Sequence, residues 1–366
     1  MSKKRAIVCF FELYPVNNGA SEVIISFFNC IKKPKKIFYI KSINANKLLK
    51  FLNVITLNKF IYFYKIISII KILISLKKFF KKSKPNTIIV EGASWIGFSF
   101  ILIYIAKKIF KNILIIYHSH NVEYDLRKQK KSNFFICKLT KFLEGIVFKL
   151  SNYCTVVSKE DQKKIYDLYK TRPLILENGI DKNRLKKFKK IKHPKQFIIF
   201  SGSYEYFSNK QAINELVWNI MPKILRKFPN LKLIITGKGL PKDIQNKDFI
   251  TYYNYLPKEK LIFLIQKSNF ILLPFNKSPG TKLKIIEALM LGSLVVCKPS
   301  SIRSIIRKNS LKSPLIYKSN HELYDAIDRI MLLKTNKSKV SNFYLNHYAM
   351  QNIISRFNNK YSINAF

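Results

Sequence analysis

The segment with the clearest capacity for chemistry is residues 278–292, which read SPGTKLKIIEALMLG. It follows an apolar run that ends at Pro274 and has the form of a glycine-containing turn that enters a helix. Backbone N–H groups at the start of a helix point outward and bind anions. We therefore expect a diphosphate site on the four residues that open this helix, which are Gly280, Thr281, Lys282 and Leu283.

The same helix carries a carboxylate, Glu287, whose sequence neighbours are Ile, Ala, Leu and Met. If this side chain faces the core it must be paired or hydrogen-bonded, because an isolated buried charge is strongly unfavourable. The alternative is a side chain that points to solvent or pairs with Lys284, three residues earlier on the helix. The segment alone leaves both interpretations open.

Glycine is scarce, with ten among 366 residues, and several glycines directly follow apolar β-type runs. Glycine is required where a Cβ does not fit, and open parallel sheets bind ligands at the carboxyl ends of their strands. The glycines with this placement are Gly19, Gly92, Gly202, Gly237, Gly239 and Gly280. An ordinary turn explains each one singly, whereas their occurrence in both halves of the chain predicts two half-sites that face a cleft.

Two histidines, His118 and His120, come at the end of another apolar run, residues 112–117. The end of a strand is a site position in such sheets, so we expect His120 to contact a ligand. A structural histidine that caps the turn after Tyr117 is the open alternative. We expect His118 to face the other side of the strand.

Short β-rich apolar runs alternate with longer helical patterns along the chain, which is typical of parallel sheets flanked by helices. The strands expected in the first half are residues 6–11, 36–40, 87–90, 112–117, 153–157 and 173–176. Those expected in the second half are residues 197–201, 231–236, 249–253, 270–274, 294–297 and 315–317.

Residues 181–195 separate the two series of strands and are rich in lysine with little apolar periodicity, so we interpret them as a linker. The expected domains are residues 1–185 and residues 195–340, each a Rossmann-like α/β domain. Residues 341–366 are expected to form one or two helices after the last strand.

The charge is extreme, with 67 Lys+Arg against 20 Asp+Glu and a formal net charge of +47. The chain is nevertheless 48% hydrophobic, which excludes a disordered basic tail. Lys, Ile, Asn, Phe and Tyr have A/T-rich codons, so nucleotide bias explains much of the lysine excess. Arginine, whose planar fork reads phosphates and guanine edges, is uncommon here, and the lysines are scattered. These features disfavour a nucleic-acid-binding protein.

Five cysteines lie in apolar runs without a CxxC pair, which predicts reduced, buried thiols in a cytosolic protein and no zinc site. Near the amino terminus, Glu12 and Pro15 interrupt the apolar stretch before a signal sequence can form. The longest apolar runs, such as residues 95–106, are shorter than the roughly 18–20 residues of a membrane span. A spanning protein is not expected.

Seven short motifs occur in a fixed order between about residues 6 and 300. They are residues 14–22, 118–124, 156–158, 177–181, 200–202 with 209–210, 235–239 and 280–296. Together they resemble the motifs of family 4 glycosyltransferases, whose amino-terminal glycine loop, HNVEY segment and nucleotide-sugar-binding motif appear in this order. The resemblance implies the GT-B fold, in which two Rossmann-like domains face a cleft and a final helix, here within residues 341–366, returns to the first domain.

The resemblance also implies a retaining, metal-independent glycosyltransferase of class EC 2.4. Such an enzyme moves a sugar from a nucleoside-diphosphate sugar to a glycan or lipid-linked acceptor, as in polysaccharide biosynthesis, and needs no cofactor or metal. By resemblance, the catalytic residues are His120, Lys210 and Glu287. The donor-binding residues are Gly19, Gly202, Ser203, Gly280, Thr281, Lys282 and Leu283. A cytoplasmic protein is expected, with a peripheral contact at the inner face of the membrane.

Two positions depart from the family pattern. Pro279 stands where the family often has the first of two glutamates, and Ser203 stands near a usual arginine. The second glutamate, Glu287, and the lysine, Lys210, are retained. The alternatives are therefore a GT-B protein that binds without catalysis and, less favoured, a basic nucleic-acid-binding protein.

Residues 59–82 have a helical pattern with two opposite stripes. The apolar stripe is Ile66, Ile69, Leu73, Leu76 and Phe80, and the other is Lys71, Ser75, Lys78 and Lys82. We favour a helix that packs on its own sheet and exposes a basic face. The alternative is docking on an anionic membrane, where each lysine near the surface contributes about 1 kcal/mol.

Overall fold

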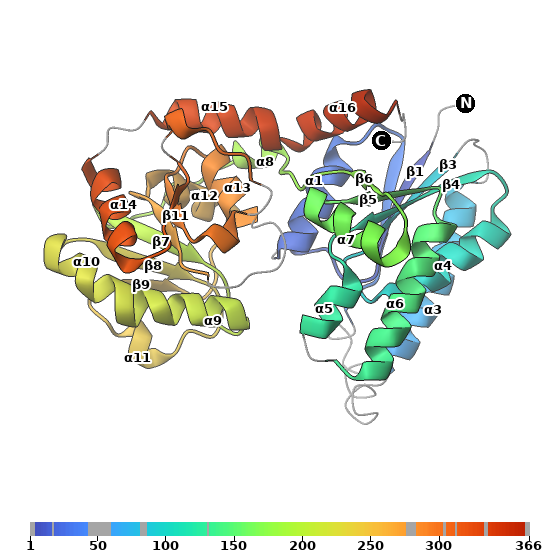
Figure 1. The fold of residues 1–366 in the computed structure, drawn as a ribbon, viewed down its shortest axis with the longest axis horizontal. Helices are drawn as coiled ribbons and strands as arrows, with labels where there is room; N and C mark the ends of the chain where they lie inside the picture. The colour runs from blue at the N-terminus through green and yellow to red at the C-terminus, as the bar shows by residue number, and fades with distance from the viewer. Residues whose placement is uncertain are drawn as a thin grey trace. The chain divides into compact units, whose positions relative to one another are not determined.

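The computed structural model describes residues 4–16, 18–42, 60–80, 86–129, 132–275, 283–302, 305–311, 313–332 and 336–362. The chain forms two compact units, drawn in Figure 1. Unit 1 consists of Met1–Asn178 and Ile353–Phe366, and unit 2 is Gly179–Asn352. All twelve expected strands are present with small shifts at their ends, so the predicted α/β class is confirmed.

Unit 1 is built on a parallel sheet of six strands in the order β2-β1-β3-β4-β5-β6. The strands are β1 (Arg5–Cys9), β2 (Lys35–Tyr39), β3 (Asn86–Glu91), β4 (Ile113–Ser119), β5 (Tyr153–Val156) and β6 (Leu174–Ile175). In the central pairing, Ile7 of β1 lies opposite Ile89 of β3. Helices cover both faces of such a sheet, which is why the middle residues of its central strands are apolar, as in Ile88–Val90 of β3.

The helices of unit 1 begin at residues that the sequence suits to that position. Asn18 caps α1 in a capping box with Ser21, and Ser158 caps α7. The helices are α1 (Gly19–Cys30), α3 (Phe60–Phe80), α4 (Ile96–Ile109), α5 (Glu123–Gln129), α6 (Phe134–Leu150), α7 (Lys159–Tyr169) and most of α16 (Met350–Tyr361). The hydroxyl of Tyr361 accepts a hydrogen bond from the Ile175 N–H at 3.3 Å, which ties α16 to β6.

Unit 2 contains two parallel three-stranded sheets, ordered β7-β8-β9 and β10-β11-β12. The strands are β7 (Phe197–Ser201), β8 (Lys232–Thr236), β9 (Ile250–Tyr253), β10 (Ile271–Leu273), β11 (Val295–Cys297) and β12 (Leu315–Ile316). Asn269, just before β10, donates its N–H to the Phe197 carbonyl and accepts the Phe197 N–H on its side chain. These two bonds join β7 to the start of β10.

Helices surround the two sheets of unit 2. They are α8 (Lys182–Leu185), α9 (Phe207–Asn214), the π-helix η2 (Glu215–Ile220), α10 (Met221–Lys227), α11 (Lys242–Gln245), α12 (Lys258–Lys267), α13 (Leu283–Met290), α14 (Asn320–Leu332) and α15 (Lys337–Tyr348), with 3₁₀ turns η3 (Pro299–Ser301) and η4 (Asn309–Leu311). Gly292 follows α13 with a φ of +78°, as expected for a residue that ends a helix. A Cβ on Gly292 would lie 2.6 Å from the carbonyl oxygen of Lys337, where α15 begins.

The division between the units differs from the predicted one. It falls after Asn178, and residues 181–195, interpreted above as a linker, belong to unit 2. The apolar side chains of Ile180 and Leu185 explain this, because both are buried in the core of that unit. The final segment is two helices, of which α15 lies in unit 2, and residues from 353 onward lie in unit 1.

The helix predicted within residues 59–82 is α3, but the predicted apolar stripe includes one residue that is exposed. Ile69, Leu73, Leu76 and Phe80 are buried, whereas Ile66 is 39% exposed. The outer face is also less polar than expected, because it exposes Tyr62, Phe63, Ile67, Ile70 and Ile74 beside Lys71, Lys77 and Lys78. Lys82 lies outside the described residues.

The cysteines match their prediction in part. None of the five forms a disulfide; Cys9, Cys137, Cys154 and Cys297 are buried, but Cys30 is partly exposed at the end of α1. Burial raises the pKa of the Cys154 thiol to about 12, so this side chain stays neutral. Within the described ranges, no helix is long and apolar enough to cross a membrane.

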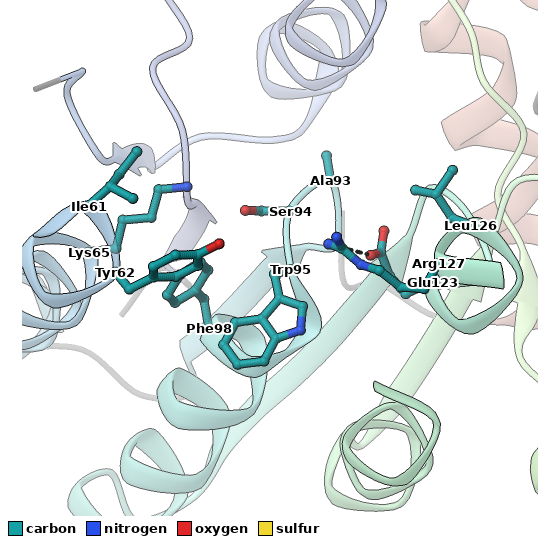
Figure 2. A pocket seen from close by; sticks show the side chains of 10 residues that line it. All are labelled: Ile61, Tyr62, Lys65, Ala93, Ser94, Trp95, Phe98, Glu123, Leu126 and Arg127. Atoms are coloured by element: carbon teal, nitrogen blue, oxygen red, sulfur yellow. Dashed lines mark ion pairs between the residues drawn. The ribbon is translucent and has the colours of Figure 1, made fainter. Parts of the chain in front are cut away.

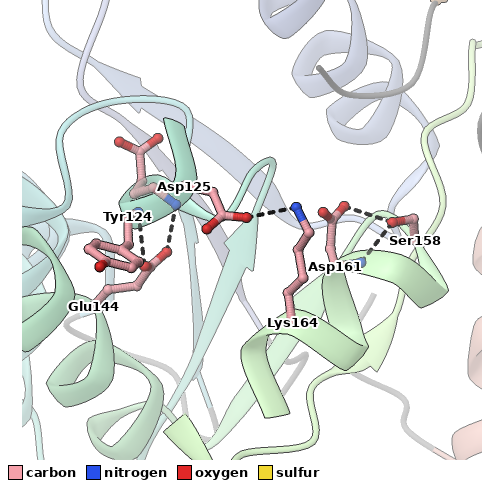
Figure 3. A network of polar contacts seen from close by, with 7 residues as sticks. Tyr124, Asp125, Glu144, Ser158, Asp161 and Lys164 are labelled. Carbon is pink, nitrogen blue, oxygen red and sulfur yellow. Dashed lines mark hydrogen bonds and ion pairs between the residues drawn. The ribbon is translucent and has the colours of Figure 1, made fainter. Parts of the chain in front are cut away.

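The carboxylate of Glu144 on α6 is fully buried and fixes the start of α5 (Figure 3). It accepts the backbone N–H of Glu123 at 2.8 Å and that of Tyr124 at 3.2 Å. The hydroxyl of Tyr169 on α7 donates a third bond at 2.6 Å. Three donors offset part of the cost of burying the charge, and the carboxylate satisfies N–H groups at a helix start.

We expect Glu144→Ala to lower the free energy of unfolding by about 3 kcal/mol or more, because it leaves three buried donors without an acceptor. Glu144→Gln retains one acceptor oxygen and should cost less. Thermal unfolding followed by circular dichroism measures both, with the exposed Glu160→Gln as the matched control. An alanine variant as stable as the wild type would contradict this role.

The same pair of variants gives a pH test. Burial raises the pKa of Glu144 above its usual value. The folded protein therefore holds a proton on the Glu144 carboxyl group more tightly than the unfolded chain does. The stability contributed by this group is therefore complete below the ordinary glutamate pKa and is lost as the pH rises through the raised value. Glu144→Gln should flatten this part of the stability profile.

Candidate active site

The carboxyl edge of the unit 1 sheet holds a buried histidine–carboxylate pair. His120, directly after β4, places Nε2 2.6 Å from Oε2 of Glu91, the last residue of β3. The two side chains are 9% and 1% exposed, respectively. Glu91 keeps its second oxygen, Oε1, buried without a hydrogen-bond partner among the described residues. The pair therefore holds the imidazole in one orientation, as carboxylates do for catalytic histidines.

The orientation predicted for His118 is wrong. Its ring lies 4.6 Å from the ring of His120 in an edge-to-face contact, because residues two apart on a strand point to the same face. Its Nδ1 lies 2.7 Å from the hydroxyl oxygen of Thr155. Burial lowers the pKa of His118 to about 4, against a smaller opposing effect of Glu91, so this ring is neutral at neutral pH.

Glu91, His118 and His120 together form a set of possible metal ligands. Each offers one ligand atom, and these atoms lie within 4.8 Å of one another. Two imidazoles and a carboxylate are ligands that zinc and iron accept. In this structure Nδ1 of His118 is hydrogen-bonded to Thr155 and Nε2 of His120 to Glu91, so one nitrogen of each ring already has a partner.

Gly19 opens α1 at the same edge of unit 1 and is exposed. Its place at the start of a twelve-residue helix puts backbone N–H groups toward solvent. This is the position that the sequence assigned to a phosphate-binding loop.

In unit 2, the glycines that follow β7 and β8 allow two loops to pack closely. A Cβ on Gly237, which has a φ of +138°, would overlap the carbonyl group of Gly202. A Cβ on Gly202 would lie 2.5 Å from Nζ of Lys284 and 2.7 Å from Nδ2 of Asn209. These glycines therefore admit specific neighbouring groups to the carboxyl end of β7.

Ser203, Asn209 and Lys284 surround Gly202. The Asn209 amide donates to the Ser203 carbonyl at 2.9 Å, and Nζ of Lys284 donates to Oδ1 of Asn209 at 3.1 Å. The Ser203 hydroxyl donates to the Lys238 carbonyl at 3.2 Å. The network brings an ammonium group to the end of β7, close to the position where the family often has an arginine.

The two predicted catalytic residues of unit 2, Lys210 and Glu287, have surroundings that differ from each other. Lys210 is exposed on α9, with Nζ 5.6 Å from the ring centre of Tyr204. Glu287 is 8% exposed and forms an ion pair with Lys258 at the start of α12. The carboxylate is thus buried and paired, but its partner is neither solvent nor Lys284.

The turn before α13 lies outside the described residues. It contains Gly280, Thr281 and Lys282, whereas Leu283 is the first residue of the helix. Sequence reasoning missed Glu91; it gave Asn209 no role beyond its place in a motif, and outside a motif treated Lys284 only as a partner for Glu287. The positions of Glu91 at a strand end and of Lys284 beside the expected diphosphate turn were the available signals.

Comparisons with known proteins agree with this architecture. Residues 195–332 match the family described as glycosyl transferases group 1. No curated protein matches the chain in sequence. Among solved structures, sucrose-phosphate synthase from Thermosynechococcus elongatus has a TM-score of 0.66 at 13% identity, covering 99% of this chain and 98% of that one.

Two further structures have the same fold. HepE from Anabaena, solved with UDP and glucose, has a TM-score of 0.67 at 11% identity over 98% of this chain and 99% of its own. A trehalose-6-phosphate protein from E. coli, solved with UDP-2-fluoro glucose, has a TM-score of 0.61 at 12% identity over 96% and 98%. The predicted GT-B fold is confirmed, and residues 195–332 of the chain match the glycosyl transferases group 1 family.

Proposed function

We propose that the chain transfers a sugar from a nucleoside-diphosphate sugar to a glycan or lipid-linked acceptor, with retention of the anomeric configuration. The observation that carries the proposal is the network at the end of β7, where Gly202 and Asn209 hold the Lys284 ammonium within the group 1 domain. HepE and the E. coli protein were solved with uridine nucleotides or their sugars. A uridine diphosphate sugar is therefore the first donor to test.

The transfer needs positive charge at the leaving group. The bond between the anomeric carbon and the diphosphate oxygen breaks, and a bond from that carbon to an acceptor oxygen forms on the same face. The acceptor proton passes to the departing phosphate oxygen. Negative charge thus develops on the diphosphate, where helix N–H groups and fixed ammonium groups stabilise it. We propose that Lys282, Lys284 and the start of α13 do this without a metal or other cofactor.

The remaining roles follow from position. Glu287 would hydrogen-bond the ribose of the nucleotide, and Gly19 would let the first unit approach the phosphates at the start of α1. Lys210, exposed on α9, would contribute a second cation. His120, held by Glu91, would contact the sugar or the acceptor hydroxyl. These assignments extend the family resemblance to residues that the structure describes.

Donor binding is the direct test. We expect UDP-glucose, or another member of a panel of UDP-, GDP- and ADP-sugars, to raise the melting temperature of the full chain and to be hydrolysed slowly. Glu287→Gln and Lys284→Met should each weaken donor binding about tenfold, because each removes a charge-assisted hydrogen bond. The matched control is Asp328→Asn, which removes an exposed ion pair with Lys227 elsewhere in unit 2.

Each outcome of that panel separates the alternatives. No stabilisation by any nucleotide sugar would sink the transferase proposal. Stabilisation without turnover would instead favour the protein that binds without catalysis, consistent with Pro279 and Ser203 at the two divergent positions.

We expect His120→Ala to lower kcat by about 100-fold, the typical contribution of a positioned acid–base group. Glu91→Gln should lower kcat by about tenfold or more while leaving the donor KM unchanged, because it removes the charge that orients His120. The exposed His321→Gln serves as the control for a lost imidazole. Equal loss of donor affinity and kcat in Glu91→Gln would show a merely structural role.

We further propose a cytoplasmic protein that contacts the inner face of an anionic membrane through α3. Its outer face combines large exposed apolar side chains with lysines, the composition of a helix that lies in a lipid interface. Ile70 is 50% exposed and Ile74 is 54% exposed, and Lys71, Lys77 and Lys78 are exposed beside them. Exposed apolar side chains are otherwise costly in water.

Vesicle flotation tests this contact. The chain should float with vesicles of phosphatidylcholine and phosphatidylglycerol, and added salt should release much of it. The double variant Ile70→Ser with Ile74→Ser should bind several-fold less, whereas Tyr255→Ser, which removes a 67% exposed ring from unit 2, should not. Absence of binding to anionic vesicles at low salt would refute the membrane contact.

A further inference from the structure

A pocket of about 320 Å³ opens in unit 1 (Figure 2). This volume lies within the roughly 300–1,000 Å³ that small-molecule sites occupy. The residues that matter for its chemistry are Tyr62, Lys65, Trp95, Phe98, Glu123 and Arg127. No role has been assigned above to this pocket.

Two walls of the pocket follow Glu91 and His120 closely in the sequence. One wall, residues 93–95, follows β3 two residues after Glu91. Another wall is α5, which begins three residues after His120. Both walls therefore extend from the carboxyl edge of the sheet, where ligands of open parallel sheets bind. The third wall is the start of α3.

Aromatic rings form much of the lining. Tyr62 and Phe98 stack with ring centres 6.4 Å apart, and Trp95 meets Phe98 edge to face at 5.4 Å. The Tyr62 side chain is 55% exposed. Flat rings with a partly negative face suit the C–H surface of a sugar ring, and their polar tips reach its hydroxyl groups.

The charges that line the pocket do not balance. Arg127 lies 3.7 Å from the Glu123 carboxylate, which accounts for one positive and one negative charge. Nε of Arg127 is buried and has no hydrogen-bond partner among the described residues. Lys65 is the second cation, with Nζ 5.1 Å from the centre of the Phe98 ring.

Lys65 has no carboxylate at ion-pair distance in the described part of the chain. Burial lowers the pKa of this ammonium group, because desolvation disfavours its charged form. A half-buried cation without a counter-charge favours an anionic ligand. Figure 2 shows Lys65 and Arg127 entering the pocket from opposite walls, with Ser94 between them in this view.

We propose that this pocket binds the acceptor and that the acceptor is a saccharide carrying a phosphate or a carboxylate group. The sugar ring lies against Tyr62 and Trp95, and the anionic group lies between Lys65 and Arg127. A neutral sugar would leave the Lys65 charge unpaired, and a bare anion would leave the aromatic walls unused. The proposal rests on the proposed transferase function, to which it adds the class of the acceptor.

Isothermal titration of the full chain tests the proposal with four probes: glucose 1-phosphate, glucuronic acid, methyl glucoside and inorganic phosphate. At least one of the two anionic sugars should bind about tenfold tighter than methyl glucoside and inorganic phosphate, because one charge-assisted contact is gained. Comparison of glucose 1-phosphate with glucuronic acid identifies the anionic group. Equal affinity for methyl glucoside and both anionic sugars overturns the proposal, as does phosphate binding as tightly as the sugar phosphate.

Variants then locate the bound sugar. Lys65→Met keeps the length of the side chain and should weaken the anionic sugar about tenfold. Tyr62→Leu, at an exposed position, should weaken it several-fold, and Lys107→Met, an exposed lysine at the end of α4, should not change it. Unchanged binding in Lys65→Met overturns the assignment.

The donor assay keeps the two proposals apart. Melting shifts with UDP-glucose should be the same in Lys65→Met and in the wild type, since the variant lies in unit 1 and the β7 network in unit 2. Donor binding without binding of any anionic sugar overturns only the acceptor class. Anionic sugar binding that depends on Lys65, without any donor binding, supports the pocket and contradicts the transferase function.

Discussion

The buried carboxylate of Glu144 is the interaction on which the unit 1 site depends. An ionised carboxylate inside a protein is stable only where donors replace its water. Here two of the donors are the first backbone N–H groups of α5, so the helix start and the carboxylate stabilise each other. Helix α5 follows the His120 turn and supplies Glu123 and Arg127 to the pocket. The Glu144 side chain on α6 therefore fixes the start of α5, the helix that links the His120 turn to the pocket.

Several acidic residues of this chain are buried and contact specific groups. The chain has only 20 Asp+Glu against 67 Lys+Arg. Five glutamates on strands or helices are nevertheless at most 8% exposed: Glu22, Glu91, Glu123, Glu144 and Glu287. The last four contact specific groups, which are respectively His120, Arg127, a helix start and Lys258. The net charge of +47 thus leaves the surface basic, while the buried carboxylates hold specific partner groups in place.

Strands and glycines were predictable from the sequence because their causes are local. A strand buried on both faces must be apolar throughout, and all twelve such runs became strands. Gly292 ends a helix with positive φ, as its position indicated. The pairs His120–Glu91 and Glu287–Lys258 were not predictable, since their partners are 29 residues apart in both cases and meet only through the sheet order and helix packing. Two predictions differ from the structure because periodicity does not report tertiary environment. Leu185, in the predicted linker, is buried in the core of unit 2, and Ile66, in the predicted buried stripe of α3, is exposed.

Helix α3 connects the proposed acceptor pocket to the proposed membrane face. Its first turns place Tyr62 and Lys65 in the pocket, and its outer surface carries Phe63, Ile67 and Ile70 in solvent. A helix has its side chains at successive 100° positions, so neighbouring residues can serve a pocket and an outer face at once. An acceptor with an anionic sugar head and a lipid tail would satisfy both proposals, with its head between Lys65 and Arg127 and its tail in the bilayer that the outer face is proposed to contact. The same segment would then select the acceptor by charge and hold the enzyme at the surface where that acceptor resides.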